Sequence, residues 1–124
     1  MTTFAIWMKT VQEDMEQALA AHLPSLNEVP ARLHEAMRYA TLDGGKRVRP
    51  LLVFAAGDLF GADAQTLARA GAAVEMIHAY SLVHDDMPCM DDDALRRGKP
   101  TVHVKYDEAT ALLVGDALQA QAFL

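Results

Sequence analysis

Several residue types that would point to particular classes of protein are scarce in this 124-residue chain. Cys89 is the only cysteine, so an internal disulfide is excluded and a reducing compartment is expected. No run approaches the ~20 uninterrupted apolar residues of a membrane-spanning helix. The N-terminal stretch also lacks the basic region and long apolar core of a signal peptide. We therefore expect a cytoplasmic protein without a membrane span.

Positive charge is also in deficit, because 11 lysines and arginines face 17 aspartates and glutamates, for a net charge of −6. This balance argues against nucleic acid as the main partner. Alanine, leucine and methionine dominate while β-branched residues are few, which favours helix over sheet. The composition, 52% hydrophobic and 23% charged, is typical of a globular domain.

Apolar residues recur at helical spacing along most of the chain, and glycines and prolines mark the breaks. Five helices are expected, at residues 3–23, 30–41, 50–61 and 63–86, with the last beginning near Asp107. Pro30 and Pro50 are each placed in a first helical turn, where proline is well tolerated. The short connections predict an all-α, antiparallel helical bundle.

The fourth expected helix is the most informative. Between Ala70 and Val83 it is apolar nearly all round, which predicts a buried central helix. His78, Ser81 and Asp85 fall on or near a single stripe of it. The helix should therefore deliver carboxylates to the mouth of an apolar interior.

An acidic segment, HDDMPCMDDD, ends this helix and contains Asp85, Asp86, Asp91, Asp92 and Asp93. Mg²⁺ takes one or two protein carboxylates together with water and substrate phosphate oxygens. Asp85 would align with Asp92 on an ideal helix, but Pro88 forbids a regular helix here. A bulge of two residues would instead bring Asp91 one turn from Asp85. We predict Asp85 and Asp91 as metal ligands, with Asp92 as the rival; a solvated acidic loop is the alternative.

A basic segment, GGKRVRP, precedes the third expected helix. Its glycines let the backbone approach an anion closely, and the helix N-terminus presents free N–H groups. Lys46 and Arg49 add donors for phosphate oxygens. The P-loop spacing is absent, and a basic surface turn is the alternative interpretation.

Arg96 and Arg97 follow the acidic segment. They could simply neutralise Asp92 and Asp93. His78 alone would more often be a core histidine than a ligand. For Arg97 to meet the GGKRVRP segment, the fold must bring together residues almost fifty positions apart.

Three segments, GGKRVRP, HAYSLVHDDMPCMDDDALRRGKPTVH and GDALQA, together resemble the trans-polyprenyl diphosphate synthases of the bacterial farnesyl diphosphate (geranyltranstransferase) type. The likeness runs from about Ala31 to the last residue. It implies the all-helical isoprenoid synthase fold around a deep cavity, Mg²⁺-dependent prenyl transfer and a homodimer. Residues 1–124 would be the N-terminal part of a single such domain.

The same resemblance implies the site. Isopentenyl diphosphate would condense with an allylic diphosphate, dimethylallyl or geranyl, to give farnesyl diphosphate. Asp85 and Asp91 would hold Mg²⁺, Arg96 would contact the allylic diphosphate, and Asp86 would belong to the same catalytic group. The diphosphate of isopentenyl diphosphate would bind to Lys46, Arg49, His78 and Arg97.

Product length is assigned to Tyr80 and Ser81. Tyr80 lies five residues before Asp85, deeper along the helix, where a large ring could stop the growing chain. The resemblance also associates an aromatic here with fifteen-carbon products. The alternative is an ordinary core aromatic.

Two other functions remain open from the sequence. The family's second aspartate-rich motif is absent from residues 1–124, so these residues alone are expected to be inactive and could act only as a helical subunit or fragment. The His84–Asp85 pair would also suit a metal-dependent phosphohydrolase.

Overall fold

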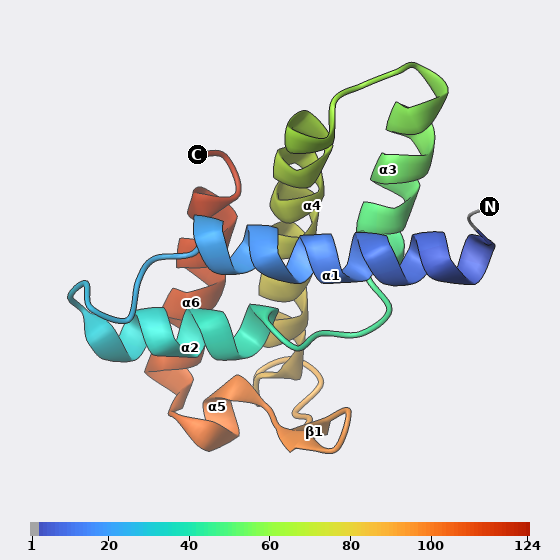
Figure 1. Ribbon diagram of the computed structural model, residues 1–124. Helices are drawn as coiled ribbons and strands as arrows, with labels where there is room; N and C mark the ends of the chain where they lie inside the picture. The colour runs from blue at the N-terminus through green and yellow to red at the C-terminus, as the bar shows by residue number, and fades with distance from the viewer. Residues whose placement is uncertain (1–2) are drawn as a thin grey trace.

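The structure, a computed structural model, describes residues 3–124. Within this range it contains six α-helices and one two-stranded sheet (Figure 1). The helices are α1 (Phe4–His22), α2 (Ala31–Thr41), α3 (Val48–Leu59), α4 (Ala64–Asp86), α5 (Val102–Lys105) and α6 (Glu108–Gln121), and the strands are β1 (Leu95–Arg96) and β2 (Lys99–Pro100). The predicted all-α class is confirmed.

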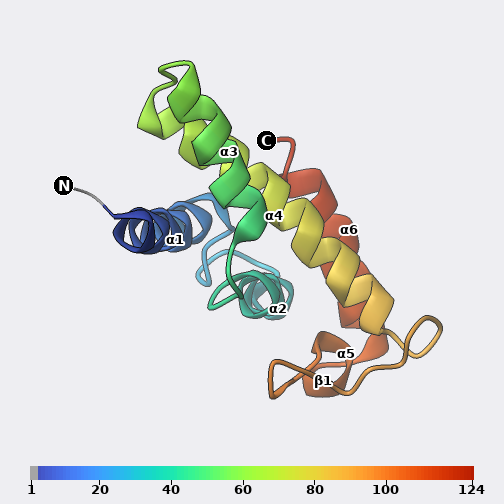
Figure 2. The same cartoon turned by 90° about the vertical axis from the view of Figure 1, so that its right-hand side faces the viewer.

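The long helix α4 is the centre of the arrangement. It packs against α6, α3, α1 and α2, and Figures 1 and 2 show α6 alongside it with α1 and α2 crossing the pair. Most of the large side chains that are fully buried are apolar and come from α1, α2, α4 and α6 (Met15, Leu19, Met37, Met76, Val114 and Leu118), and Thr41 of α2 and Pro50 of α3 join them. The core therefore lies where α1, α2, α4 and α6 meet, and it fixes the position of the C-terminal end of α4.

Side-chain caps set two of the predicted helix starts. Asp63 accepts a hydrogen bond from the Thr66 amide at 2.8 Å, and Asp107 accepts one from the Thr110 amide at 2.6 Å. Both caps confirm the predicted boundaries.

The two prolines are placed differently from the prediction. Pro30 is the residue before α2 and does not lie in its first turn. The helix α3 begins at Val48, which makes Pro50 its third residue. That position is tolerated because the first amides of a helix have no intrahelical partner.

The expectation that α4 is buried nearly all round holds on one face only. Its neighbours cover that face, whereas Val74 is 37% exposed. The polar side chains on the buried face are Glu75 and Asp86, while His78 is half-buried and Asp85 is exposed. The helix thus sends Asp86 inward and leaves Asp85 outside, a distinction that the apolar pattern alone does not contain.

A small β-hairpin follows the acidic segment where the sequence predicted only a loop. Leu95 pairs with Pro100 and Arg96 with Lys99, around a two-residue turn of Arg97 (φ 52°) and Gly98 (φ 76°). Positive φ at both central residues matches the right-handed twist of a tight hairpin. Strands of two residues are too short to leave an alternating pattern, which is why the hairpin was missed.

The hairpin is fastened to α2. The Tyr39 hydroxyl donates to the Pro100 carbonyl at 2.6 Å. The Thr101 hydroxyl donates to the Asp93 carbonyl at 2.8 Å. These bonds hold Arg96 and Arg97 close to the junction of α2 and α4.

Among residues 3–124, no helix combines the length and hydropathy needed to cross a membrane.

Candidate functional site

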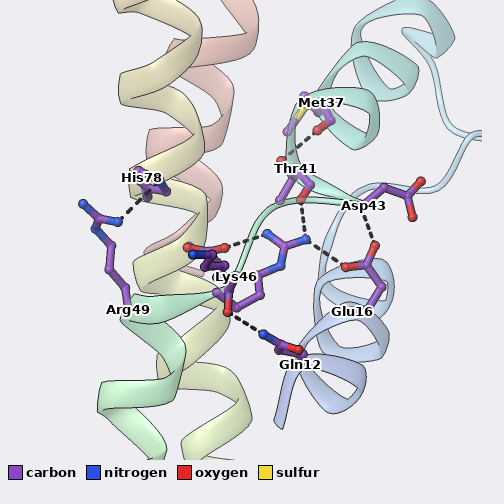
Figure 3. A network of polar contacts seen from close by, with 10 residues as sticks. Gln12, Glu16, Met37, Thr41, Asp43, Lys46, Arg49 and His78 are labelled. Atoms are coloured by element: carbon purple, nitrogen blue, oxygen red, sulfur yellow. Dashed lines mark hydrogen bonds and ion pairs between the residues drawn. The ribbon is translucent and has the colours of Figure 1, made fainter. Parts of the chain in front are cut away.

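The loop between α2 and α3 is built around Arg47. This residue has a left-handed backbone (φ 57°), and its side chain is only 6% exposed. Its guanidinium donates to Glu75 at 2.6 Å, to Glu16 at 2.8 Å and to the Thr41 carbonyl at 2.8 Å (Figure 3). The loop is therefore tied to α1, α2 and α4 at one point.

The side chains on either side of Arg47 remain accessible. Lys46 and Arg49 are exposed, and Arg49 Nη1 lies 3.4 Å from Nε2 of His78 on α4 (Figure 3). A cavity of about 220 Å³ opens beside them, lined by residues that include Lys46, Arg49, His78 and Arg97. The four residues assigned to one diphosphate from the sequence thus border one cavity.

Gly45 brings the two basic segments together. A Cβ atom placed on Gly45 would lie 3.1 Å from Nη1 of Arg97. The arginine therefore rests against the glycine backbone, although the two residues are 52 positions apart. The predicted meeting of Arg97 with the GGKRVRP segment is confirmed as a matter of geometry.

The surroundings of His78 shift its pKa. Burial lowers its pKa from the ordinary value, and the positive charge of Arg49 lowers it further. Glu75 opposes these effects, while Arg96 and Arg97 add to them more weakly. A neutral imidazole can accept a hydrogen bond from Arg49, and it would gain a proton more readily once an anion entered the cavity.

Asp86 and Arg96 form a two-pronged ion pair. Arg96 Nε and Nη2 donate to the two oxygens of Asp86 at 2.9 and 2.7 Å, and the Asp86 side chain is 5% exposed. The hydrogen bond to Asp86 is the main reason why the pKa of Arg96 is raised above its ordinary value. Arg96 therefore pairs with Asp86, and Asp93 acts on it only through a weaker charge effect.

A second cavity, of about 60 Å³, lies beside this ion pair. Its lining includes Asp86, Arg96 and Arg97 together with Tyr39 from α2 and Lys99 from the hairpin. Arg97 borders both cavities, as do three apolar residues: Ala40, Ala79 and Leu82. The two basic clusters therefore face adjoining cavities that share these four lining residues.

The acidic loop folds back onto the end of α4. The Asp91 amide donates to the Asp85 carbonyl at 2.8 Å, and the Asp93 amide donates to the Asp86 carbonyl at 3.0 Å. The first bond spans two residues more than the bond of a regular helix and the second spans three more, and Asp92 takes a left-handed conformation (φ 53°). This is the predicted two-residue bulge, and it brings the backbone of Asp91 beside that of Asp85.

The donor set at this loop is suited to Mg²⁺. The side chains of Asp85 and Asp91 are exposed, and Mg²⁺ needs one or two carboxylates with water and substrate phosphates completing the shell. Over residues 3–124, no group of three or more His, Cys, Asp or Glu side chains is arranged to enclose a metal. Asp85 and Asp91 thus supply the one or two carboxylates that Mg²⁺ takes from a protein.

Tyr80 and Ser81 lie away from the two cavities and line neither. The half-buried Tyr80 ring meets the His84 ring edge-on at 5.5 Å, and His84 Nε2 lies 3.0 Å from the Leu112 carbonyl on α6. Ser81 donates to the His78 carbonyl at 2.7 Å. The role of Tyr80 and Ser81 in product length stays a prediction.

Sequence reasoning missed three residues that organise the site: Glu16, Arg47 and Glu75. Glu75 had a visible signal, because it is the only acidic residue in the apolar stretch between Ala70 and Val83. Glu16 and Arg47 had none, because both sit in segments already rich in charge.

The profile of the polyprenyl synthetase family matches residues 30–124. The chain belongs to this family. A probable farnesyl diphosphate synthase of Sinorhizobium fredii is 60% identical over 119 residues, which cover 96% of this chain and 36% of that protein. The farnesyl diphosphate synthase of Haemophilus influenzae is 56% identical over 120 residues, 97% of this chain and 41% of that protein.

Solved structures give the same family fold. An FPP/GFPP synthase from Zymomonas mobilis superimposes with a TM-score of 0.90 at 56% identity, over 94% of this chain and 42% of that one. A geranyltransferase from Legionella pneumophila gives a TM-score of 0.88 at 46% identity, over 93% of this chain and 40% of that one. The isoprenoid synthase fold is thus confirmed, and the chain spans well under half the length of these relatives. None of these matches supports the phosphohydrolase alternative.

Proposed function

We propose that the protein containing these residues is a prenyltransferase that condenses isopentenyl diphosphate with dimethylallyl or geranyl diphosphate to give farnesyl diphosphate. The observation that carries the proposal is the convergence of Lys46, Arg49, His78 and Arg97 on one cavity, next to the Asp86–Arg96 pair. Family membership supports it, as do relatives that are named farnesyl diphosphate synthases.

The larger cavity is proposed to bind the diphosphate of isopentenyl diphosphate. Lys46 and Arg49 supply charge and donors for its oxygens, and Arg97 lines the same cavity. The lowered pKa of His78 favours its neutral form, and a bound anion would favour the protonated form. The site thus adapts its charge to the ligand.

The allylic diphosphate is proposed to bind at the end of α4, between the acidic loop and Arg96. Mg²⁺ bound by Asp85 and Asp91 would neutralise the negative charge that develops on the departing diphosphate. Asp86 holds the Arg96 guanidinium in one orientation through two hydrogen bonds, so its remaining donors are directed before the substrate arrives.

The chemistry then follows from charge. The allylic carbon–oxygen bond breaks, and the electron pair leaves with the diphosphate, which Arg96 stabilises. The double bond of isopentenyl diphosphate attacks the allylic cation and forms the new carbon–carbon bond. Loss of a proton from the resulting cation restores a double bond. Apolar residues between the two cavities, such as Ala79 and Leu82, keep water from the reacting carbons.

The decisive experiment compares Michaelis constants in the full-length protein, with and without Mg²⁺. Replacing Lys46 or Arg49 by alanine should raise KM for isopentenyl diphosphate more than KM for the allylic substrate, because each diphosphate has its own basic cluster. Lys9→Ala is the matched control, since Lys9 is a 77% exposed lysine that lines neither cavity. Equal effects on both substrates, or turnover independent of Mg²⁺, would contradict the proposal.

Three further properties belong to the same proposal. The enzyme is a homodimer, it works in the cytoplasm, and residues 1–124 are the N-terminal part of one catalytic domain and inactive alone. The last rests on the coverage of the relatives, of which this chain spans 36% and 41%.

A further inference from the structure

The GGKRVRP segment contains three cationic residues, Lys46, Arg47 and Arg49, and Arg47 differs from the other two in its exposure and contacts. Lys46 and Arg49 are exposed, whereas the Arg47 side chain is 6% exposed and three of its five N–H donors are taken by Glu75, Glu16 and the Thr41 carbonyl. An arginine shared between two carboxylates has little charge left for a ligand. Its contribution must therefore come through the residues beside it.

The backbone of this loop is held in an unfavourable shape. Arg47 has φ of 57° and Asp43 has φ of 52°, both in the left-handed region that side chains other than glycine avoid. Such conformations persist only where the surroundings over-determine them. The left-handed Arg47 also fixes the direction in which the chain enters α3, since its carbonyl accepts the Leu51 amide at 3.0 Å.

Contacts from α1 and α4 supply that determination. Glu16 on α1 accepts from Arg47 with one oxygen and from the Asp43 amide with the other. Gln12, also on α1, donates to the Lys46 carbonyl at 2.8 Å. Glu75 on α4 is 4% exposed, and Arg47 is its partner. These contacts hold the loop at Asp43, Lys46 and Arg47. Among them, only the Arg47–Glu75 ion pair has both side chains buried.

Gly44 fits this arrangement as well. A Cβ atom at Gly44 would lie 2.5 Å from Arg47 Nη1 and 2.7 Å from its Cζ. The guanidinium therefore lies directly on the backbone of the loop whose shape it sets. Any residue with a side chain at this position would displace it.

We propose that Arg47, held by Glu75 and Glu16, is a positioning residue that keeps Lys46 and Arg49 aimed into the same diphosphate-binding cavity. This inference rests on the proposed function of that cavity. It predicts that the anion affinity of the loop depends on an ion pair that borders this cavity but whose charges are matched within the protein.

The test separates positioning from stability. Arg47→Met with Glu75→Met removes both buried charges together, and well-packed apolar replacements of a buried ion pair are often tolerated. Lys9→Met with Glu13→Met removes an exposed pair, so it is the charge-matched control. In the full-length protein, binding of inorganic diphosphate without added divalent cation is measured by calorimetry, and hydrogen exchange is followed at the Gly44, Gly45 and Lys46 amides.

The affinity of the Arg47/Glu75 double variant for inorganic diphosphate should fall by roughly tenfold or more, because the binding side chains are out of position. Hydrogen exchange should accelerate at the Gly44, Gly45 and Lys46 amides. A folded double variant whose affinity for inorganic diphosphate stays within about twofold of that of the parent protein would overturn the inference. A change of that size is no larger than the scatter seen between independent sites. If Lys46→Met and Arg49→Met also bound normally, the proposed function of the cavity would fail first. Glu16→Gln, at a side chain 37% exposed, gives a smaller change in the same direction and serves if the double variant does not fold.

Discussion

Arg97 lies against Gly45, with its Nη1 atom 3.1 Å from the place a Cβ would occupy, while the guanidinium of Arg47 lies still closer to Gly44. The two neighbouring glycines thus serve different arginines. One arginine is exposed and can move, whereas the other is locked by three hydrogen bonds. This difference can be tested by adding a single methyl group.

Gly44→Ala should destabilise the protein by about 1–3 kcal/mol, the usual effect of overpacking, because the Arg47 guanidinium cannot retreat. Gly45→Ala should leave stability nearly unchanged and weaken diphosphate binding, because only the end of the Arg97 side chain has to shift. Chemical denaturation and calorimetric binding measure the two effects. The reverse order of stabilities would show that Arg47 is not locked in place.

The adjacent aspartates at the end of α4 should separate function from stability. Asp85→Ala should reduce turnover by roughly three orders of magnitude, the loss expected for a main charge-stabilising group, with an unchanged melting temperature because Asp85 is exposed. Asp86→Ala should also cost about 2–3 kcal/mol of stability, since it removes a charged hydrogen-bond partner. Near-normal turnover of Asp85→Ala alongside an inactive Asp92→Ala would transfer the metal site to the rival aspartate.

Much of this site could be predicted from the sequence, for a physical reason. Helical periodicity, the caps at Asp63 and Asp107 and the interruption at Pro88 are local features, so they fixed most helix boundaries and the two-residue bulge before Asp91. The predicted start of α3 at Pro50 was wrong. Proline is tolerated anywhere in the first helical turn, so a helix that begins two residues earlier, at Val48, satisfies the same constraint.

Contacts between distant segments were not predictable in this way. Nothing local distinguishes Arg47 from Lys46, because the distinction is made by Glu16 and Glu75, which lie 31 and 28 residues away. Asp86 was likewise grouped with Asp85 from the family resemblance, whereas the packing of α4 turns one inward and the other out. The convergence of Arg97 with the glycine loop was reached only through the family resemblance.

His78 gives the site a pH dependence of definite sign. The folded protein lowers the pKa of His78, chiefly by burial and next through Arg49. As pH falls, the unfolded chain therefore binds the proton first, so stability is complete above the ordinary pKa of ~6.5 and declines below it. Histidine ring resonances in NMR titrations should show this low pKa, and inorganic diphosphate should raise it. A pKa insensitive to diphosphate would remove His78 from the anion site.

Tyr80 should determine product length if the growing chain runs along α4. Tyr80→Ala in the full-length protein should shift products from fifteen carbons towards twenty and more, while Mg²⁺ dependence stays intact. Tyr80→Phe is the matched control, because it keeps the ring that meets His84 edge-on. Chromatography of the dephosphorylated alcohols gives the distribution. An unchanged pattern in Tyr80→Ala would return this residue to the core.

The central claim is that basic residues from two distant segments, Arg49 and Arg97, form one diphosphate site. A double-mutant cycle on inorganic diphosphate binding, with Arg49→Met, Arg97→Met and the pair in the full-length protein, measures this directly. Each single variant should weaken binding, and the pair should deviate from additivity by at least ~0.5 kcal/mol, as groups sharing a partner do. Strict additivity, or one variant binding like the parent protein, would contradict a shared site.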